Sequence, residues 1–214
     1  MVHSWRTKFN QGDLPFYYVQ IAPYRYENKD PNASEIAFFR EKQIEFRKLK
    51  NVEMVTTLDV GNPTDIHPKD KKPVGLRLAY IALNKTYHKK VAYQGPQFGH
   101  FKVSGNQVEI SFKPRTVSGG LVTSDGSVPK YFQIAGADKK FYEADASIVG
   151  NKIVVKSRNV PEPVAVRYAF VNAPATNLQN GKGLPTEQFR TDNWKEDWIQ
   201  PKLDFVPIIL DNEK

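Results

Sequence analysis

The stretch NVEMVTTLDVGNPTDIHPKDKKPVGLRLAYIAL, residues 51–83, combines an apolar run, a polar loop and an amphipathic segment. Residues 51–60 form a run of strand length, which is typical of a strand buried on both faces in a parallel sheet. Residues 71–87 carry aliphatic side chains at the spacing of one helical face, and Asp70 stands where an N-cap residue would. The stretch therefore predicts a strand and a helix joined by a long loop.

The preceding residues repeat this order. PFYYVQIAPY, residues 15–24, is a second apolar run of strand length. PNASEIAFFREKQIEFRKLK, residues 31–50, has an apolar stripe at helical spacing, with Asn32 and Glu35 placed like a capping box. Two such units indicate an α/β fold with a three-layer parallel sheet. Two strands and two helices cannot cover both faces of such a sheet, so we expect residues 1–92 to form only part of that domain.

Beyond residue 92 the pattern changes to short alternating runs separated by turns. The pairs Gly105 and Asn106, Asp125 and Gly126, and Gly150 and Asn151 supply the positive φ that two-residue hairpins require. Strands at this interval are typical of a β-sandwich or jelly roll. We therefore expect an antiparallel β-sandwich domain in residues 93–214, ending in an extended tail.

Composition excludes several classes of site. The chain has 214 residues and no cysteine, so disulfides and thiolate metal sites are ruled out. The formal net charge is +8, but the lysines occur as scattered pairs instead of one basic run, which favours solvated faces over a nucleic-acid partner. No apolar run approaches the roughly 18 residues of a membrane span. His88 and His100 lack partners at metal-ligand spacing, and we expect no metal.

The loop between the second predicted strand and its helix contains His67, one of only four histidines. A loop held by a rigid sheet and helix presents a side chain without a core around it, and catalytic residues favour such positions. The alternative interpretation is a solvated loop histidine. Both interpretations are open at this point.

Several arginines are expected to have structural roles. Arg40 and Glu41, on the helix within residues 31–50, are predicted to form surface or interdomain pairs. Arg77 either braces the His67 loop or is a solvated or salt-bridged arginine. Arg167 and Arg190 are assigned to packing within the β region.

Six blocks between residues 14 and 194 agree in order and spacing with one known group of enzymes, and the resemblance covers roughly residues 5–194. The blocks are LPFYYVQIAPY, FFREKQ, DVGNPTDIHPKDKKPVGLRLAYIAL, FQIAGADKKFYEADASIVGNKIVVKS, PVAVRYAF and NLQNGKGLPTEQFRTDNW. Together they resemble the C-terminal half of bacterial sialate O-acetylesterases, which are members of the SGNH hydrolase superfamily. The resemblance implies a partial SGNH-type α/β fold followed by the β-sandwich.

SGNH enzymes draw their nucleophilic serine, two oxyanion-hole residues and a histidine base from four sequence blocks. Only the histidine block has a counterpart here, and the resemblance makes His67 the base. None of the nine serines stands in a nucleophile elbow. The resemblance therefore implies that the serine comes from outside these residues and that the chain alone is inactive.

The carboxylate that would orient His67 has several candidates. Many SGNH enzymes place an aspartate three residues before the histidine, but that position is Thr64 here. Asp65 is the first candidate and Asp59 the alternative, while a backbone carbonyl is a third possibility. Asp65 could equally form a plain Asx turn in this loop.

The resemblance implies a carbohydrate O-acetylesterase of the sialate 9-O-acetylesterase type. It would release acetate from O-acetylated sialic acid or a related sugar by a Ser-His-Asp mechanism, without a cofactor. Its expected partner is a second copy or an N-terminal half that carries the serine, and its expected location is periplasmic or secreted. The alternative is a noncatalytic carbohydrate-binding or structural module left from a truncated esterase.

Overall fold

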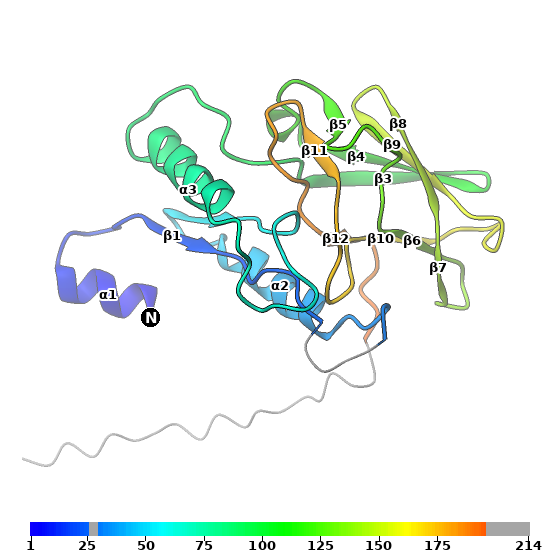
Figure 1. Cartoon of the computed structure of the whole chain (residues 1–214), viewed down its shortest axis with the longest axis horizontal. Helices are drawn as coiled ribbons and strands as arrows, with labels where there is room; N and C mark the ends of the chain where they lie inside the picture. Colours follow the sequence, from blue (N-terminus) through cyan, green and yellow to red (C-terminus); the bar gives the residue numbers. More distant parts are fainter. Residues whose placement is uncertain (26–29, 196–214) are drawn as a thin grey trace, which may run out of the picture.

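The computed structural model describes residues 1–25 and 30–195, so the last part of the predicted tail lies outside the described residues. The N-terminal part has one short parallel sheet and helices around it (Figure 1). Its elements in chain order are α1 (Val2–Phe9), β1 (Phe16–Val19), α2 (Glu35–Phe46), β2 (Val52–Val55) and α3 (Lys72–Lys85).

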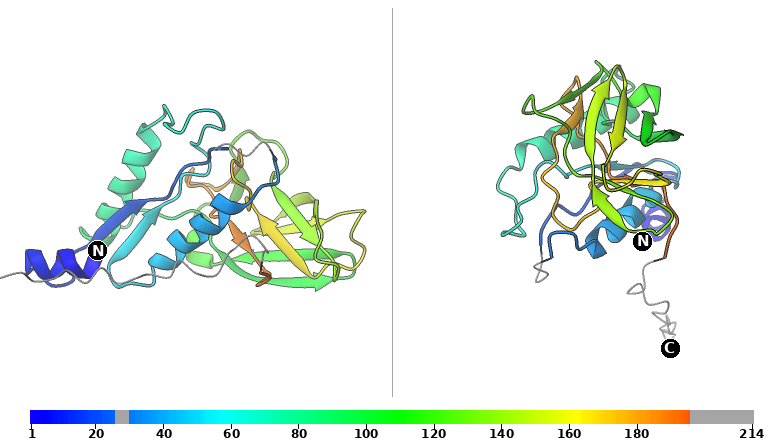
Figure 2. Two further views of the ribbon diagram at one scale, coloured as in Figure 1. Left: turned by 90° about the horizontal axis from the view of Figure 1, so that it is seen from below. Right: turned by 90° about the vertical axis from the view of Figure 1, so that its right-hand side faces the viewer.

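Helices α2 and α3 lie on opposite faces of the β1–β2 sheet (Figures 1 and 2). On one face the rings of Phe16 and Tyr18 pack against Phe46 of α2, with centroids 6.1 and 5.4 Å apart. On the other face the Tyr17 hydroxyl lies 2.7 Å from Oγ1 of Thr86, directly after α3. This alternation along β1 gives three layers from one strand pair. The expectation that two helices cannot reach both faces of such a sheet is therefore wrong.

Helix α2 receives its cap from a distant residue. The backbone N–H of Ile36 donates to Oδ1 of Asn172 at 2.9 Å, and Nδ2 of Asn172 donates to the Glu35 carboxylate at 2.8 Å. The predicted capping box of Asn32 and Glu35 is wrong, because Ser34 takes the N-cap position and makes no side-chain cap hydrogen bond. The β region therefore completes the first turn of this helix.

Helix α3 also begins differently from the prediction. Lys71, not Asp70, takes the N-cap position, and no side chain caps the helix. Pro73 lies in the first turn, where a proline costs no hydrogen bond because a backbone N–H at that position has no intrahelical acceptor. The predicted Asp70 cap is therefore wrong, whereas the helix itself is confirmed.

The β region contains two four-stranded antiparallel sheets and a two-stranded one. The first sheet has the order β3 (Phe98–Ser104), β4 (Gln107–Phe112), β9 (Lys152–Lys156), β8 (Asp145–Val149). The second has the order β12 (Phe189–Arg190), β10 (Ala165–Tyr168), β6 (Phe132–Ala135), β7 (Phe141–Glu143). β5 (Leu121–Thr123) pairs with β11 (Leu178–Asn180), and the short 3-10 helix η1 (Pro114–Thr116) precedes β5.

Two of the three predicted hairpins are confirmed. Gly105 and Gly150, with φ of 59° and 60°, form the turns of the β3–β4 and β8–β9 hairpins. Gly126 also has a positive φ, 69°, but its turn connects β5 to β6, which do not pair with each other. A positive-φ turn fixes a local reversal of the chain, whereas the pairing partner depends on the rest of the fold.

The two four-stranded sheets share one apolar core. Val108 and Ile153 of the first sheet and Ile134 and Val166 of the second belong to one cluster of fully buried side chains. Leu58, which follows β2, belongs to the same cluster, so the N-terminal part contributes to the core of the β region. The predicted order, a small parallel sheet with helices followed by antiparallel sheets, is confirmed, and the boundary after residue 92 stays a prediction.

Arg40 of α2 is wholly buried between the two parts of the chain. Its guanidinium donates to Oε1 of Gln188 at 2.7 Å, to the carbonyl of Asn172 at 3.0 Å and to the carbonyl of Val171 at 2.5 Å. A buried guanidinium is tolerated because such donors are satisfied by acceptors fixed in the fold. Of the two predicted alternatives for Arg40, a surface or an interdomain contact, the structure shows the interdomain one.

Two ion pairs join α2 to the last strand region. Arg47, directly after α2, pairs bidentately with Glu187 at 2.5 and 2.6 Å. Arg190 of β12 pairs bidentately with Glu41 at 2.8 and 3.0 Å. Arg190 therefore binds across the junction and not only within the β region. No helix in residues 1–25 and 30–195 is long and apolar enough to cross a membrane.

Candidate functional site

The loops that follow β1 and β2 leave the sheet at its carboxyl edge and contact each other. The backbone N–H of Arg25 donates to the carbonyl of Pro63 at 3.2 Å. Gly61 lies so close to Pro23 that a Cβ built on it would come within 2.5 Å of the proline ring. Any larger residue would push the loops apart, so glycine is required by the close approach of the two chains.

Two consecutive Asx turns shape the loop that carries His67. Oδ1 of Asn62 accepts hydrogen bonds from the backbone N–H and the hydroxyl of Thr64, both at 3.0 Å. Oδ1 of Asp65 accepts the backbone N–H of His67 at 2.9 Å. Such turns fix a polar loop locally, without a core beneath it. The Asx-turn interpretation of Asp65 is therefore confirmed.

The same turn brings the Asp65 carboxylate to the imidazole. His67 Nδ1 lies 3.8 Å from Oδ1 of Asp65, slightly beyond hydrogen-bond distance. The His67 side chain is 87% exposed, and its ring makes no hydrogen bond within residues 1–25 and 30–195. A ring in this position can exchange protons with a group that approaches it from solvent.

Asp59 is already bound elsewhere. Both of its carboxylate oxygens accept hydrogen bonds from Arg77, at 2.8 and 2.5 Å. Arg77, with its side chain only 8% exposed, also donates to the carbonyl of Thr56 at 2.9 Å. This ion pair ties the end of β2 to α3 and supports the base of the His67 loop. Of the two candidate carboxylates, the structure brings Asp65 to the imidazole and engages Asp59 with the arginine.

No serine hydroxyl hydrogen-bonds to His67 in the part of the chain that the structure describes. Among those residues there is also no group of three or more His, Cys, Asp or Glu side chains that could hold a metal ion. Among the described residues the site therefore brings together an exposed imidazole and a carboxylate, without a serine hydroxyl beside them.

Gln20, at the carboxyl end of β1, was not singled out by sequence reasoning. Its side chain is 2% exposed, and neither its amide nitrogen nor its amide oxygen finds a hydrogen-bond partner among the described residues. Its backbone carbonyl accepts the Thr57 hydroxyl at 3.0 Å, so it lies where the two strands end. Leaving a buried amide unpaired costs about 1–3 kcal/mol, which makes Gln20 a candidate polar group of the site. Its sequence signal is a lone amide within an apolar run.

Comparison with known proteins gives a similarity among solved structures. No family model and no curated protein matches the chain. Among solved structures, the chain is similar to a carbohydrate acetylesterase from Xanthomonas citri, with a TM-score of 0.83 and 36% sequence identity. The similarity covers 91% of this chain and 45% of that one, so the chain spans less than half the length of its relative. The chain is thus related to a carbohydrate esterase.

Proposed function

We propose that this chain is the histidine-bearing part of a carbohydrate O-acetylesterase of the sialate 9-O-acetylesterase type, within the SGNH superfamily. The observation that carries the proposal is the exposed imidazole of His67, held beside Asp65 at the carboxyl edge of a parallel sheet. Ligands of open α/β sheets bind at this edge. Similarity to a carbohydrate acetylesterase supports the choice of substrate class.

In the proposed reaction His67 moves one proton in each half of the cycle. Its Nε2 accepts the proton of a serine hydroxyl as that oxygen attacks the acetyl carbonyl, and returns the proton to the sugar oxygen when the ester bond breaks. In the second half it accepts a proton from water, which attacks the acyl-serine, and acetate leaves as the serine hydroxyl is restored. The serine oxygen and the sugar oxygen must both reach Nε2, and the position of His67 in a loop leaves room for both.

Asp65 orients the imidazole in this mechanism. A hydrogen bond from Nδ1–H to the carboxylate keeps the proton on Nδ1 and leaves Nε2 free to accept one. The present separation of 3.8 Å needs to shorten only slightly for this bond to form. Catalytic hydrogen bonds are often long before substrate binds. Asp59 is the weaker candidate, because its two oxygens are bound by Arg77.

The serine and the oxyanion donors come from polypeptide outside these residues in this proposal, from an N-terminal half in preference to a second copy. Within the described residues β1 pairs only with β2, and its other edge has no strand beside it. Val19 at the end of β1 is 39% exposed. An open edge of this kind can accept a further parallel strand. The partner half would complete the sheet as well as supply the nucleophile.

Acetate release by the purified chain tests whether the serine comes from a partner half. We expect O-acetylated sialic acid to be hydrolysed no faster than in buffer, because no serine of the described residues is hydrogen-bonded to His67 and we assign the oxyanion donors to the partner half. Acetate release that disappears in His67→Ala would show that a serine of this chain is the nucleophile. It would contradict the proposal that a partner half supplies it.

A fusion protein tests the substrate class. In the fusion, this chain would replace the matching part of the Xanthomonas citri enzyme. We expect it to release acetate from 9-O-acetylated sialic acid faster than from acetylated xylan. Faster release from acetylated xylan would support an acetylesterase function but contradict the proposed sialate substrate.

A further inference from the structure

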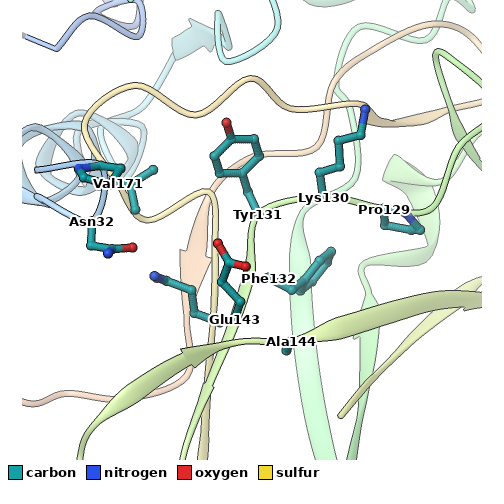
Figure 3. Close-up of a pocket in the computed structure, with 10 residues that line it drawn as sticks. Asn32, Pro129, Lys130, Tyr131, Phe132, Glu143, Ala144 and Val171 are labelled. Atoms are coloured by element: carbon teal, nitrogen blue, oxygen red, sulfur yellow. The ribbon is translucent and has the colours of Figure 1, made fainter. Parts of the chain in front are cut away.

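A cavity of about 410 Å³ lies where the segment before α2 meets β6 and β7 (Figure 3). Its lining comes from residues 31–32, 129–133, 143–144 and 171, which are far apart in the sequence. Ligand pockets for small molecules usually enclose about 300–1,000 Å³. The cavity uses none of the residues assigned to ester hydrolysis.

Tyr131, on the wall of this cavity, has an unusual backbone conformation. Its φ is 64°, in the left-handed region that side chains with a Cβ rarely adopt. The conformation is held by a hydrogen bond of 2.9 Å from the Ala169 N–H to the Tyr131 carbonyl, and Ala169 itself has a φ of 53°. The Tyr131 side chain stays 40% exposed. The backbone is therefore strained at a residue whose aromatic ring is partly exposed. Strained backbone conformations are found preferentially at functional sites.

Polar side chains without protein partners surround this ring. Gln133 of β6 and Glu143 of β7 lie opposite each other on paired strands. Asn32 lies across the cavity from Glu143 (Figure 3). None of these three side chains makes a hydrogen bond or ion pair within the described residues. Lys130 differs, because its ammonium lies 2.7 Å from the Asp125 carboxylate outside the cavity wall. The cavity thus offers two amides and one carboxylate without a cation.

We propose that this cavity binds a neutral saccharide unit. The Tyr131 ring packs against the C–H face of a pyranose, because an exposed aromatic ring binds such a face with little loss of side-chain entropy. Glu143 accepts hydrogen bonds from sugar hydroxyls, while the amides of Gln133 and Asn32 both donate and accept. The unpaired carboxylate repels a carboxylated sugar, so the ligand is neutral and is not sialic acid itself. The noncatalytic module hypothesis requires a saccharide site of this kind, and the esterase proposal does not depend on it.

Saccharide titration monitored by protein NMR tests the proposal. The chain is titrated with the methyl glycosides of glucose, galactose, mannose and xylose, with the corresponding neutral disaccharides, and with N-acetylneuraminic acid. We expect at least one neutral saccharide to bind with a Kd on the order of millimolar, and N-acetylneuraminic acid to bind at least tenfold more weakly. His67→Ala should leave this binding unchanged, which separates the cavity from the esterase site.

Two variants decide the role of Tyr131 and Glu143. Tyr131→Asn removes the ring and suits a left-handed backbone, so binding should fall at least tenfold while the melting temperature is kept or raised. Tyr87→Asn removes a ring that is more exposed than that of Tyr131, 65% against 40%, and that does not line the cavity, so it should leave binding intact. Glu143→Gln removes the charge without changing the volume and should weaken binding at least threefold.

Three results would overturn the proposal. They are the absence of binding by every neutral saccharide, affinity that Tyr131→Asn and Glu143→Gln both leave unchanged, and a preference for N-acetylneuraminic acid. If Tyr131→Asn lowers the melting temperature, the Glu143→Gln result alone decides between a binding role and a structural one.

Discussion

Asp65 and Asp59 differ in what their carboxylates already bind, and this difference separates their roles. Asp59→Asn should lower the free energy of unfolding by about 2–3 kcal/mol, because it leaves the nearly buried Arg77 without its counter-charge. Asp65→Asn should change it by less than about 0.5 kcal/mol, because the site is exposed and asparagine keeps the acceptor for the His67 N–H. Urea denaturation of the two variants measures both values.

The reverse order would contradict the structure at this loop. In the fusion enzyme, Asp65→Asn should also slow acetate release, because the amide cannot stabilise a protonated imidazole as the carboxylate does. If Asp65→Asn releases acetate at the parent rate, Asp65 does not orient the imidazole, and a backbone carbonyl becomes the candidate for that role.

Asp192 makes stability depend on pH. Burial acts to raise its pKa, but the hydrogen bonds and positive charge of Arg167, with the charge of Arg190, outweigh burial and hold the pKa below its ordinary value. A carboxyl with a lowered folded-state pKa stabilises the fold above the ordinary pKa, and this stabilisation is lost as the pH falls through the lowered value. The window for this group lies below about pH 4.

Asp192→Asn should therefore lose about 3 kcal/mol of unfolding free energy at neutral pH, since the Asp192 side chain has no exposed surface and Arg167 would stay buried without it. The difference from the wild type should shrink as the pH falls below about 4. Unfolding curves at several pH values measure it. A difference that stays constant down to about pH 2 would contradict the assignment to Asp192.

Individual residues differ in how far the sequence predicts them. The position of His67 in an exposed loop and the Asx turn at Asp65 follow from the local sequence. Asp and Asn side chains accept hydrogen bonds from the backbone two residues later, and Pro fixes its own φ, so these residues determine the turn without distant contacts. Gln20 could not be predicted, because its lack of partners depends on everything that packs around the end of β1. The conformation of Tyr131 is likewise imposed by Ala169 across a strand pair.

Among the elements, α2 depends most on a distant side chain. Asn172→Ala removes the acceptor for the Ile36 N–H and the donor to Glu35, so it should lower the unfolding free energy by about 1–2 kcal/mol. Faster hydrogen exchange of the Ile36 amide should accompany the loss. Asn193→Ala, at an exposed position nearby in the sequence, is the matched control. Equal effects of the two substitutions would show that the cap contributes nothing.

The existence and order of the elements were predictable, whereas their starts and partners were not. The apolar runs of residues 15–24 and 51–60 identify both parallel strands, but only β2 is largely buried, whereas β1 is half-buried and its last residue, Val19, is exposed. The Asn32 and Asp70 caps failed, because a tertiary acceptor and a helix-starting proline replaced them. The partner of β5 is β11, which local turn chemistry cannot specify.

At the scale of the whole molecule, α2 connects the parallel sheet to the β region through Arg40. Arg40→Met should lower the unfolding free energy by about 3 kcal/mol or more, because it leaves the Gln188 amide oxygen and two buried carbonyls without donors. We expect the near-ultraviolet and far-ultraviolet transitions to coincide in the wild type and to separate in Arg40→Met as the two parts uncouple. Circular dichroism during thermal unfolding measures both effects.

Lys42→Met on the same helix is the control, because its side chain is 71% exposed and its partner Glu45 is on the same helix. A single transition of unchanged midpoint in Arg40→Met would show that the junction does not depend on the arginine. The sequence predicted a surface or an interdomain pair for Arg40. It could not identify the acceptors, which are brought together only by the folded β region.

Loss of acetate release on removal of the His67 ring is the most direct test of the account. The measurement compares the fusion enzyme with its His67→Ala variant on 9-O-acetylated sialic acid, with His88→Ala as the control. We expect His67→Ala to lower kcat by roughly a thousandfold or more and His88→Ala to have no effect. Acetate release that survives His67→Ala at the parent rate would contradict the proposal that this imidazole is the base, and so would a folded fusion that releases no acetate.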